Sequence, residues 1–103
     1  MWRGWFIGNF SPAVLKTESF EIGLLKHPKG EIWPDHYHAI ATEYNLLVSG
    51  HMKIGGREIH PNDIFILEPH EVASPEFLED CVLVCIKTPS IIGDKYYINE
   101  SEI

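Results

Sequence analysis

The sequence reads Gly30-Glu31-Ile32-Trp33-Pro34-Asp35-His36-Tyr37-His38 at its most distinctive point. His36 and His38 are two residues apart, so in a β-strand both imidazoles lie on one face, about 6.6 Å apart along the strand. If the loop Ala39–Thr42 returns the chain alongside, the Glu43 carboxylate faces both rings across a gap. Two neutral imidazoles and one carboxylate form a facial ligand set for a divalent metal, with open positions for water or substrate. A closed structural site would instead take four protein ligands.

Short runs rich in β-branched and aromatic residues recur along the chain. They cover Phe20–Leu25, Glu43–Val48, His51–Ile54, Arg57–Ile59, Ile64–Leu67, Val82–Lys87 and Tyr96–Ile98. Turn-forming residues separate these runs, and Gly55-Gly56 predicts a two-residue hairpin loop because glycine accepts a positive φ. Long stretches with apolar residues at helical spacing are missing. The pattern predicts an all-β sandwich or small barrel, and 103 residues suffice for one domain only, spanning 1–103.

The fixed positions Gly30-x5-His36-x-His38-x4-Glu43-x6-Gly50 resemble the first sequence motif of the cupin superfamily. The resemblance implies a cupin-type double-stranded β-helix, which is a jelly-roll barrel of two antiparallel sheets. In cupins that carry this motif, the two histidines and the glutamate hold a divalent metal inside the barrel. The resemblance therefore implies that His36, His38 and Glu43 are metal ligands.

The second cupin motif is incomplete in this chain. Asn62-Asp63 stands where cupins usually have Gly-Asp, and asparagine tolerates the left-handed backbone that such a turn requires. Alignment on the aspartate places Ala73 where the family has a fourth metal-binding histidine, with Ser74 as the next choice. His70 falls three residues early, so it is either a fourth ligand on a differently bent loop or a turn residue. Glu71 is a further candidate for a substitute ligand.

The charge balance narrows the classes of partner. Eight lysines and arginines against 15 aspartates and glutamates give a net charge of −7 and a pI near 5.2. Binding to nucleic acid or to an anionic membrane surface requires a basic face, so neither partner is expected. A small-molecule ligand or substrate remains.

The cysteines and the N-terminus bear on the compartment. Cys81 and Cys85 lie four apart in an apolar run, which in a strand separates them by about 13 Å, too far for a disulfide. The first residues show neither a secretory signal nor an apolar run of membrane-spanning length. Free thiols and the absence of a signal predict a cytoplasmic protein.

Several other residues admit two interpretations. Trp33 either lines the barrel mouth or contacts a second subunit, and Asn45 and Arg57 are the polar groups most suited to face a ligand. The segment Lys87–Tyr96 could bind an acidic group but reads better as a surface loop. The expectation for three further histidines, each near a strand end, is an ordinary structural or solvated role: His27, His51 and His60. Tyr37 should face away from the neighbouring histidines.

The first ten residues are unusually aromatic for a free tail. They include Trp2, Trp5, Phe6, Ile7 and Phe10. These side chains either pack on the domain's own sheet or cover a partner subunit, where strand exchange would also hide exposed sheet edges. A homodimer is the expected assembly.

Three functions remain open. The first is a metal-dependent enzyme, dioxygenase- or isomerase-like, acting on a small organic molecule with an oxygen donor group. The second is a non-catalytic module that binds a sugar or organic acid through the same metal. The third is metal-free isomerisation with a histidine as the base. The ligand set suits Fe, Mn, Ni, Co and Zn alike, so the residues do not select the metal.

Overall fold

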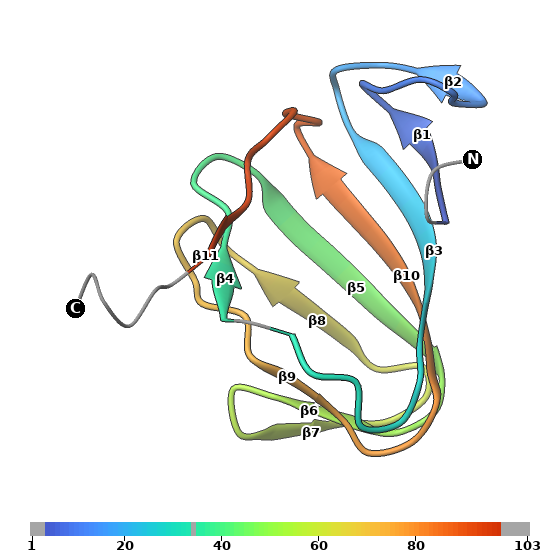
Figure 1. Cartoon of the computed structure of the whole chain (residues 1–103), viewed down its shortest axis with the longest axis vertical. Helices are drawn as coiled ribbons and strands as arrows, with labels where there is room; N and C mark the ends of the chain where they lie inside the picture. The colour runs from blue at the N-terminus through green and yellow to red at the C-terminus, as the bar shows by residue number, and fades with distance from the viewer. Residues whose placement is uncertain (1–3, 34, 98–103) are drawn as a thin grey trace.

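Two curved walls of β-structure enclose the interior of the protein, as a computed structural model describes it for residues 4–33 and 35–97 (Figure 1). The larger wall is a six-stranded sheet in the order β2-β1-β3-β10-β5-β8. Its strands are β1 (Trp5–Gly8), β2 (Leu15–Lys16), β3 (Glu21–His27), β10 (Cys81–Thr88), β5 (Thr42–Ser49) and β8 (Ile64–Leu67). All of its pairings are antiparallel except that of β1 with β2.

The opposite wall consists of two smaller sheets. One has the order β7-β6-β9, and the other pairs β11 with β4. Their strands are β7 (Arg57–Ile59), β6 (Met52–Ile54), β9 (Pro75–Phe77), β11 (Tyr96–Tyr97) and β4 (His36–Tyr37). An antiparallel bridge between His36 and Ala73 links β4 to the segment that enters β9. The all-β jelly-roll expectation is therefore confirmed, and no helix occurs in the described ranges.

The hydrophobic core fills the end of the barrel nearest the β6–β7 hairpin. Its buried members include Leu47, Met52, Phe65, Phe77 and Leu83, which come from both walls. Alternation along each strand explains this arrangement, because every second residue of a strand points inward. A cavity adjoins this core, and core side chains such as Met52 and Phe65 line it together with polar side chains.

The turns follow the predicted backbone chemistry. Gly55 and Gly56 both have positive φ, +57° and +77°, in the two-residue loop between β6 and β7. Asn62 takes a φ of +77°, as expected for the asparagine that replaces the turn glycine. Gly50 has a φ of +98°, and an added Cβ would lie 2.3 Å from the Asp80 carbonyl oxygen, so only glycine fits there.

Four strands were not among the predicted runs: β1, β2, β4 and β9. β1 pairs with β3 of the same chain, so Trp5, Phe6 and Ile7 pack on the domain's own sheet. Trp2 of the same aromatic group, and Ile98 of the last predicted strand, lie outside the described residues. β4 and β5 are not paired neighbours but lie in opposite walls. The loop 39–42 thus carries the chain across the barrel rather than alongside.

Both cysteines are buried free thiols, as predicted. Cys81 belongs to the core, and its thiol donates to the His51 carbonyl at 3.4 Å. Cys85 lines the cavity instead. Burial raises the pKa of the Cys85 thiol well above its usual value, with the nearby Glu43 carboxylate adding to the effect, so this thiol remains protonated at neutral pH.

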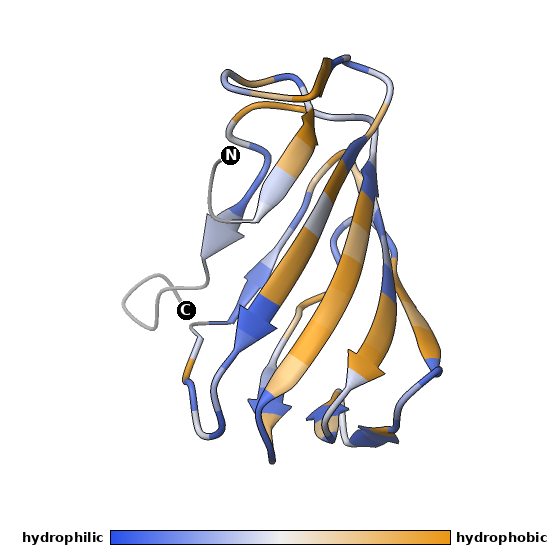
Figure 2. Cartoon of the chain, turned by 90° about the vertical axis from the view of Figure 1, so that its right-hand side faces the viewer, coloured by the Kyte–Doolittle hydropathy of each residue, from blue (hydrophilic) through white to orange (hydrophobic). Residues whose placement is uncertain are grey.

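The outer face of the large sheet carries many apolar side chains, on strands whose residues are largely hydrophobic (Figure 2). Cross-strand register aligns two rows of four outward side chains on β3, β10, β5 and β8: Ile22, Ile86, Tyr44 and Ile66 in one, and Leu24, Val84, Leu46 and Ile64 in the other. Five of the eight are exposed: Leu24, Ile86, Tyr44, Ile64 and Ile66. Strands apolar on both faces are typical of sheets that are covered on both sides.

Candidate metal centre and cavity

A cavity of about 680 Å³ lies between the two walls. Its size falls within the range of roughly 300–1,000 Å³ usual for small-molecule sites. Apolar side chains such as Leu25, Phe65 and Leu67 line one part, and titratable side chains gather in another. The cavity therefore offers apolar contact area together with a few charged groups.

His36 and His38 both point into this cavity from β4 and the residue after it. They are buried, with 8% and 5% of their surface exposed, and their ring centroids are 5.8 Å apart. Tyr37 between them faces the other way, where its ring stacks on Tyr96. The two-residue spacing thus places both imidazoles on one face, as predicted.

The His38 ring is held in one orientation by the chain segment before β11. Its Nδ1 donates a hydrogen bond to the backbone carbonyl of Asp94. In a neutral imidazole this leaves Nε2 without a proton, as an electron-pair donor. That Nε2 is buried, has no hydrogen-bond partner, and lies 3.4 Å from Oε1 of Glu43.

Glu43 reaches the cavity from β5 in the opposite wall. Burial disfavours its ionised form, but the facing His38 ring, the Lys87 ammonium and the Asn45 amide together outweigh this effect. They lower the pKa of Glu43 from 4.5 to about 2. The Asn45 amide donates to Oε2 at 3.0 Å, which leaves Oε1 directed toward His38. Glu43 is therefore a carboxylate at neutral pH.

With a neutral imidazole at His38, its Nε2 and the Glu43 carboxylate are two electron-pair donors that face each other in a buried site. Such a pair is unfavourable unless a cation, either a proton or a metal ion, lies against both atoms. Neutral imidazole and carboxylate are ligands that divalent transition metals accept. The donor set that meets in this part of the cavity thus fits a metal ion.

The position of the missing family histidine is occupied by Ala73. His36 and Ala73 exchange two backbone hydrogen bonds, 3.3 and 2.7 Å long, so their side chains lie opposite each other on one face. Ala73 is buried and lines the cavity. A histidine at this position would point at the same space as His36.

His70 does not line the cavity. It has a φ of +69° in an exposed turn, where its backbone N–H donates to the His38 carbonyl at 2.6 Å and its ring packs against Tyr37. Since Tyr37 faces away from the cavity, His70 lies on the wrong side to serve as a fourth ligand, which corrects that expectation. Glu71 is also exposed, and its carboxylate accepts the backbone N–H of Glu68.

Two charged side chains that the sequence did not place in the cavity, Glu21 and Lys87, lie beside Glu43. The register pairs Glu21 with Lys87 and Lys87 with Glu43, and all three side chains line the cavity. The Lys87 ammonium lies 4.0 Å from Glu43 Oε1. Burial raises the pKa of Glu21 above its usual value, although the positive charge of Lys87 opposes the shift. A lysine thus separates two carboxylates inside the barrel.

The prediction of a surface loop for residues 87–96 is wrong in part. Lys87 is the last inward-facing residue of β10, and three later residues also line the cavity: Ser90, Asp94 and Lys95. Alternation could have revealed Lys87, because it lies two residues after the inward Cys85 in one strand. The roles of the other three depend on how the chain folds back after β10, which local pattern does not encode.

Asp94 acts as a structural clamp behind His38. Its carboxylate accepts backbone N–H groups of Ala39, Ile40 and Ala41 at 2.9–3.3 Å. Burial acts to raise the pKa of Asp94, but these amide hydrogen bonds prevail and lower it. The segment that carries the His38 acceptor is thereby tied to the loop that joins β4 and β5.

Of the other residues singled out in the sequence, Trp33, Asn45 and His27 line the cavity and Arg57 does not. Trp33 lines the cavity, as one of its two interpretations predicts, and the Lys95 ammonium lies 4.3 Å from its ring centroid. Asn45 lines it too, whereas Arg57 is exposed on β7 and does not. His27 also reaches the cavity, where its ring stacks on Phe77 at 4.5 Å.

Comparison with solved structures identifies the fold. A Klebsiella pneumoniae protein with a double-stranded β-helix domain is similar over 84% of this chain and 76% of its own, with a TM-score of 0.73 and 19% identity. An RmlC-like cupin protein from Ralstonia eutropha gives a TM-score of 0.62 and 20% identity, over 81% and 58% of the two chains. A variant of Streptomyces PAC13 with uridine gives a TM-score of 0.65 and 15% identity, over 84% and 75% of the two chains.

These likenesses establish the fold. The chain has the double-stranded β-helix fold of these structures, which confirms the fold that the resemblance to cupins implied. No protein-family model matches the sequence, and no curated protein matches it either. The described ranges contain no helix long and apolar enough to cross a membrane.

Proposed function

We propose that this chain is a small cupin metalloprotein that holds a divalent transition metal with His36, His38 and Glu43. The observation that carries the proposal is the unpartnered, buried Nε2 of His38 facing the ionised Glu43 carboxylate. When bound, a metal would supply Lewis-acid or oxygen-activating chemistry to a substrate donor atom. Fe, Mn, Ni, Co and Zn all suit this ligand set.

The chain's own residues prepare the site for that ion. The Asp94 carbonyl accepts the Nδ1 proton of His38, which directs the lone pair of Nε2 into the cavity. The Asn45 amide holds one Glu43 oxygen and leaves the other available. Ordered donors of this kind bind a cation without a large reorganisation cost.

The substrate that fits best is a small organic molecule with an anionic oxygen group and an apolar body. Lys87 and Lys95 provide positive charge on the cavity wall, and the apolar side chains beyond them accept the remainder of the molecule. Glu21, whose pKa burial raises, is suited to exchange a proton with such a substrate. The similar PAC13 variant was determined with uridine, a small organic molecule, which supports a ligand of this size class.

A non-catalytic binding module is the second candidate. The alanine at position 73 favours it, because three protein ligands hold a metal less tightly than four and a binding module needs no turnover. Metal-free isomerisation is a third, with a proton rather than a metal shared between His38 and Glu43.

A turnover screen separates these candidates. The full chain, free of any histidine tag, is loaded with each of the five metals and offered a panel of small carboxylates, enols and vicinal diols. Substrate consumption by NMR and oxygen uptake are recorded together. Turnover that is lost in Glu43→Gln but kept in His70→Asn supports the metalloenzyme, and binding without turnover supports the module. Turnover that survives chelation supports the metal-free reaction and overturns the proposal.

We also propose that two copies pair through the apolar outer face of the large sheet. Its two rows of outward side chains carry no charge, so a second copy of the same face would complement it without burying an ion. Large contiguous apolar patches on soluble proteins often mark association surfaces.

A further inference from the structure

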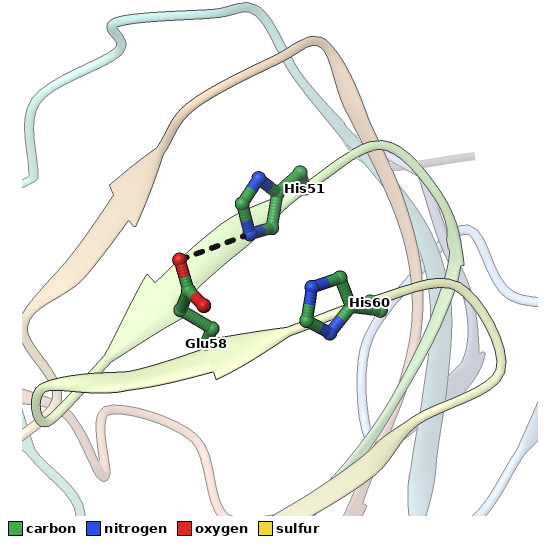
Figure 3. Close-up of side chains that lie close together, drawn as sticks. All are labelled: His51, Glu58 and His60. Atoms are coloured by element: carbon green, nitrogen blue, oxygen red, sulfur yellow. Dashed lines mark ion pairs between the residues drawn. The ribbon is translucent and has the colours of Figure 1, made fainter.

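Two histidines and a glutamate meet on the β6–β7 hairpin, away from the cavity (Figure 3). Met52 pairs with Ile59, so continuing the ladder by one residue sets His51 opposite His60. Glu58 lies two residues before His60 and therefore shares its face of the strand. None of the three lines the barrel interior.

The three side chains converge closely. Nε2 of His51 lies 3.6 Å from Oε1 of Glu58, and the His51 and His60 rings stack with centroids 4.8 Å apart. One ligand atom from each residue lies within 4.8 Å of the other two. The His51 Nε2 is moreover buried and has no hydrogen-bond partner. A buried nitrogen left unsatisfied beside a carboxylate indicates a site for a cation.

Asp63 orients the second histidine. Its carboxylate accepts the backbone N–H of His60 at 2.8 Å and lies 3.7 Å from the His60 Nδ1. A carboxylate facing one ring nitrogen directs the other toward a metal, an arrangement common behind metal-binding histidines. Asp63, in the turn between β7 and β8, is thus a positioning residue for the His60 ring.

We propose that His51, Glu58 and His60 form a second, surface metal site for a divalent cation of the zinc class. Imidazole suits Zn²⁺, Cu²⁺ and Ni²⁺, and the single carboxylate is compatible with each. The side chains of Glu58 and His60 are 54% and 60% exposed, so they can rotate their donor atoms onto one ion. Lys53, opposite Glu58 in the ladder, supplies the positive charge that competes with that ion.

The site would fasten the hairpin to the core. His51 directly precedes β6, and its carbonyl accepts the backbone N–H groups of Leu78 and Glu79 after β9. A cation that joins His51 to His60 therefore braces three strands of the smaller wall. Because binding occurs only in the folded chain, Zn²⁺ should raise the resistance to unfolding.

The test follows the histidine side chains individually. The full-length chain without a tag is titrated with ZnCl₂, and long-range ¹H–¹⁵N spectra report each imidazole. We expect the His51 and His60 resonances to move and to saturate, in the wild type and equally in the His38→Gln variant that disables the cavity. His51→Gln and His60→Gln should abolish the event.

Two further variants sharpen the result. Asp63→Asn should weaken Zn²⁺ binding at the hairpin by about tenfold or more while the imidazole shifts persist at saturation. His70→Asn removes a different exposed histidine and should leave the titration unchanged. Imidazole signals of His51 and His60 that stay fixed in excess Zn²⁺ would overturn the proposal, whatever happens in the cavity.

Discussion

His36 and Ala73 lie directly opposite each other on the cavity wall and exchange two backbone hydrogen bonds. The pairing places a methyl group at the position from which cupins usually offer a further histidine. The proposed metal site therefore has an alanine where a fourth ligand would stand. A site with three protein ligands leaves more positions for water or substrate and binds its metal less tightly.

The first prediction restores that ligand. Ala73→His points into the same space as His36, and the adjoining cavity of about 680 Å³ accommodates the larger side chain. We expect the affinity of the cavity for Co²⁺ or Zn²⁺ to rise by about tenfold or more, which corresponds to roughly 1.4 kcal/mol per decade. Competition with a chromophoric chelator measures it. Ser74→His, on the next and exposed residue, is the control, and equal affinity in both variants would contradict the alignment.

Asp94 gives a prediction for stability and pH. Its carboxylate accepts backbone N–H groups of Ala39, Ile40 and Ala41, and its pKa is lower in the folded chain than usual. The resulting stabilisation is complete above the unfolded pKa of about 3.9 and is lost as the pH falls through the lower folded value.

Asp94→Asn removes the charge and should lower the free energy of unfolding by about 1–3 kcal/mol at pH 7. The difference from the wild type should shrink at the acid end, where the wild-type carboxylate is itself protonated. Urea unfolding at several pH values measures both effects. Glu18→Gln is the matched control, because it removes an exposed charge, and a loss as large as that of Asp94→Asn would refute the clamp.

Lys87 gives a prediction for the Glu43 carboxylate. Its ammonium, 4.0 Å from Glu43 Oε1, is among the groups that lower the pKa of Glu43 to about 2. Lys87→Met should therefore raise the Glu43 pKa toward 4.5, and the stability that Glu43 contributes should be lost at a higher pH than in the wild type. A ¹³C carboxyl titration by NMR measures the shift. An unchanged midpoint would mean that Lys87 does not act on Glu43.

The outer sheet face gives a prediction for assembly. We expect the wild type to sediment as a dimer, and Tyr44→Glu combined with Ile66→Glu to convert it to a folded monomer, because two buried charges would oppose the apolar contact. Ile32→Glu places the same charge on a side chain that is 90% exposed outside this face, and should leave the dimer intact. A monomeric wild type at micromolar concentrations would exclude this interface.

The sequence predicted most of the features that depend on local pattern. The two-residue spacing predicted that His36 and His38 share one face of a strand. The Gly55-Gly56 pair predicted the β6–β7 hairpin, and Asn62 has the left-handed backbone that its turn position predicted. The recurrence of short strands predicted an all-β sandwich or small barrel, and the resemblance to cupins implied the jelly roll. Each of these properties is set by residues close together in the chain.

The features that were missed depend on contacts between distant segments. Glu21 faces Lys87 only because β3 pairs with β10, and Asp94 reaches the β4–β5 loop only after the chain folds back. The convergence of His51, Glu58 and His60 depends on the register of β6 with β7, which the turn sequence alone does not determine. His70 lies three residues early for a ligand, and its turn directs the ring to the outer side, as the alternative of a turn residue predicts.

The most direct test of the central claim is to locate a bound ion in the barrel. Pseudocontact shifts from Co²⁺ are measured by NMR on the His60→Gln chain, so that the hairpin does not contribute. The account predicts one ion within coordination distance, about 2.0–2.2 Å, of His36, His38 and Glu43, absent from His36→Gln/His38→Gln and retained in His70→Asn. Shifts that place no ion in the cavity at saturating Co²⁺ would contradict it.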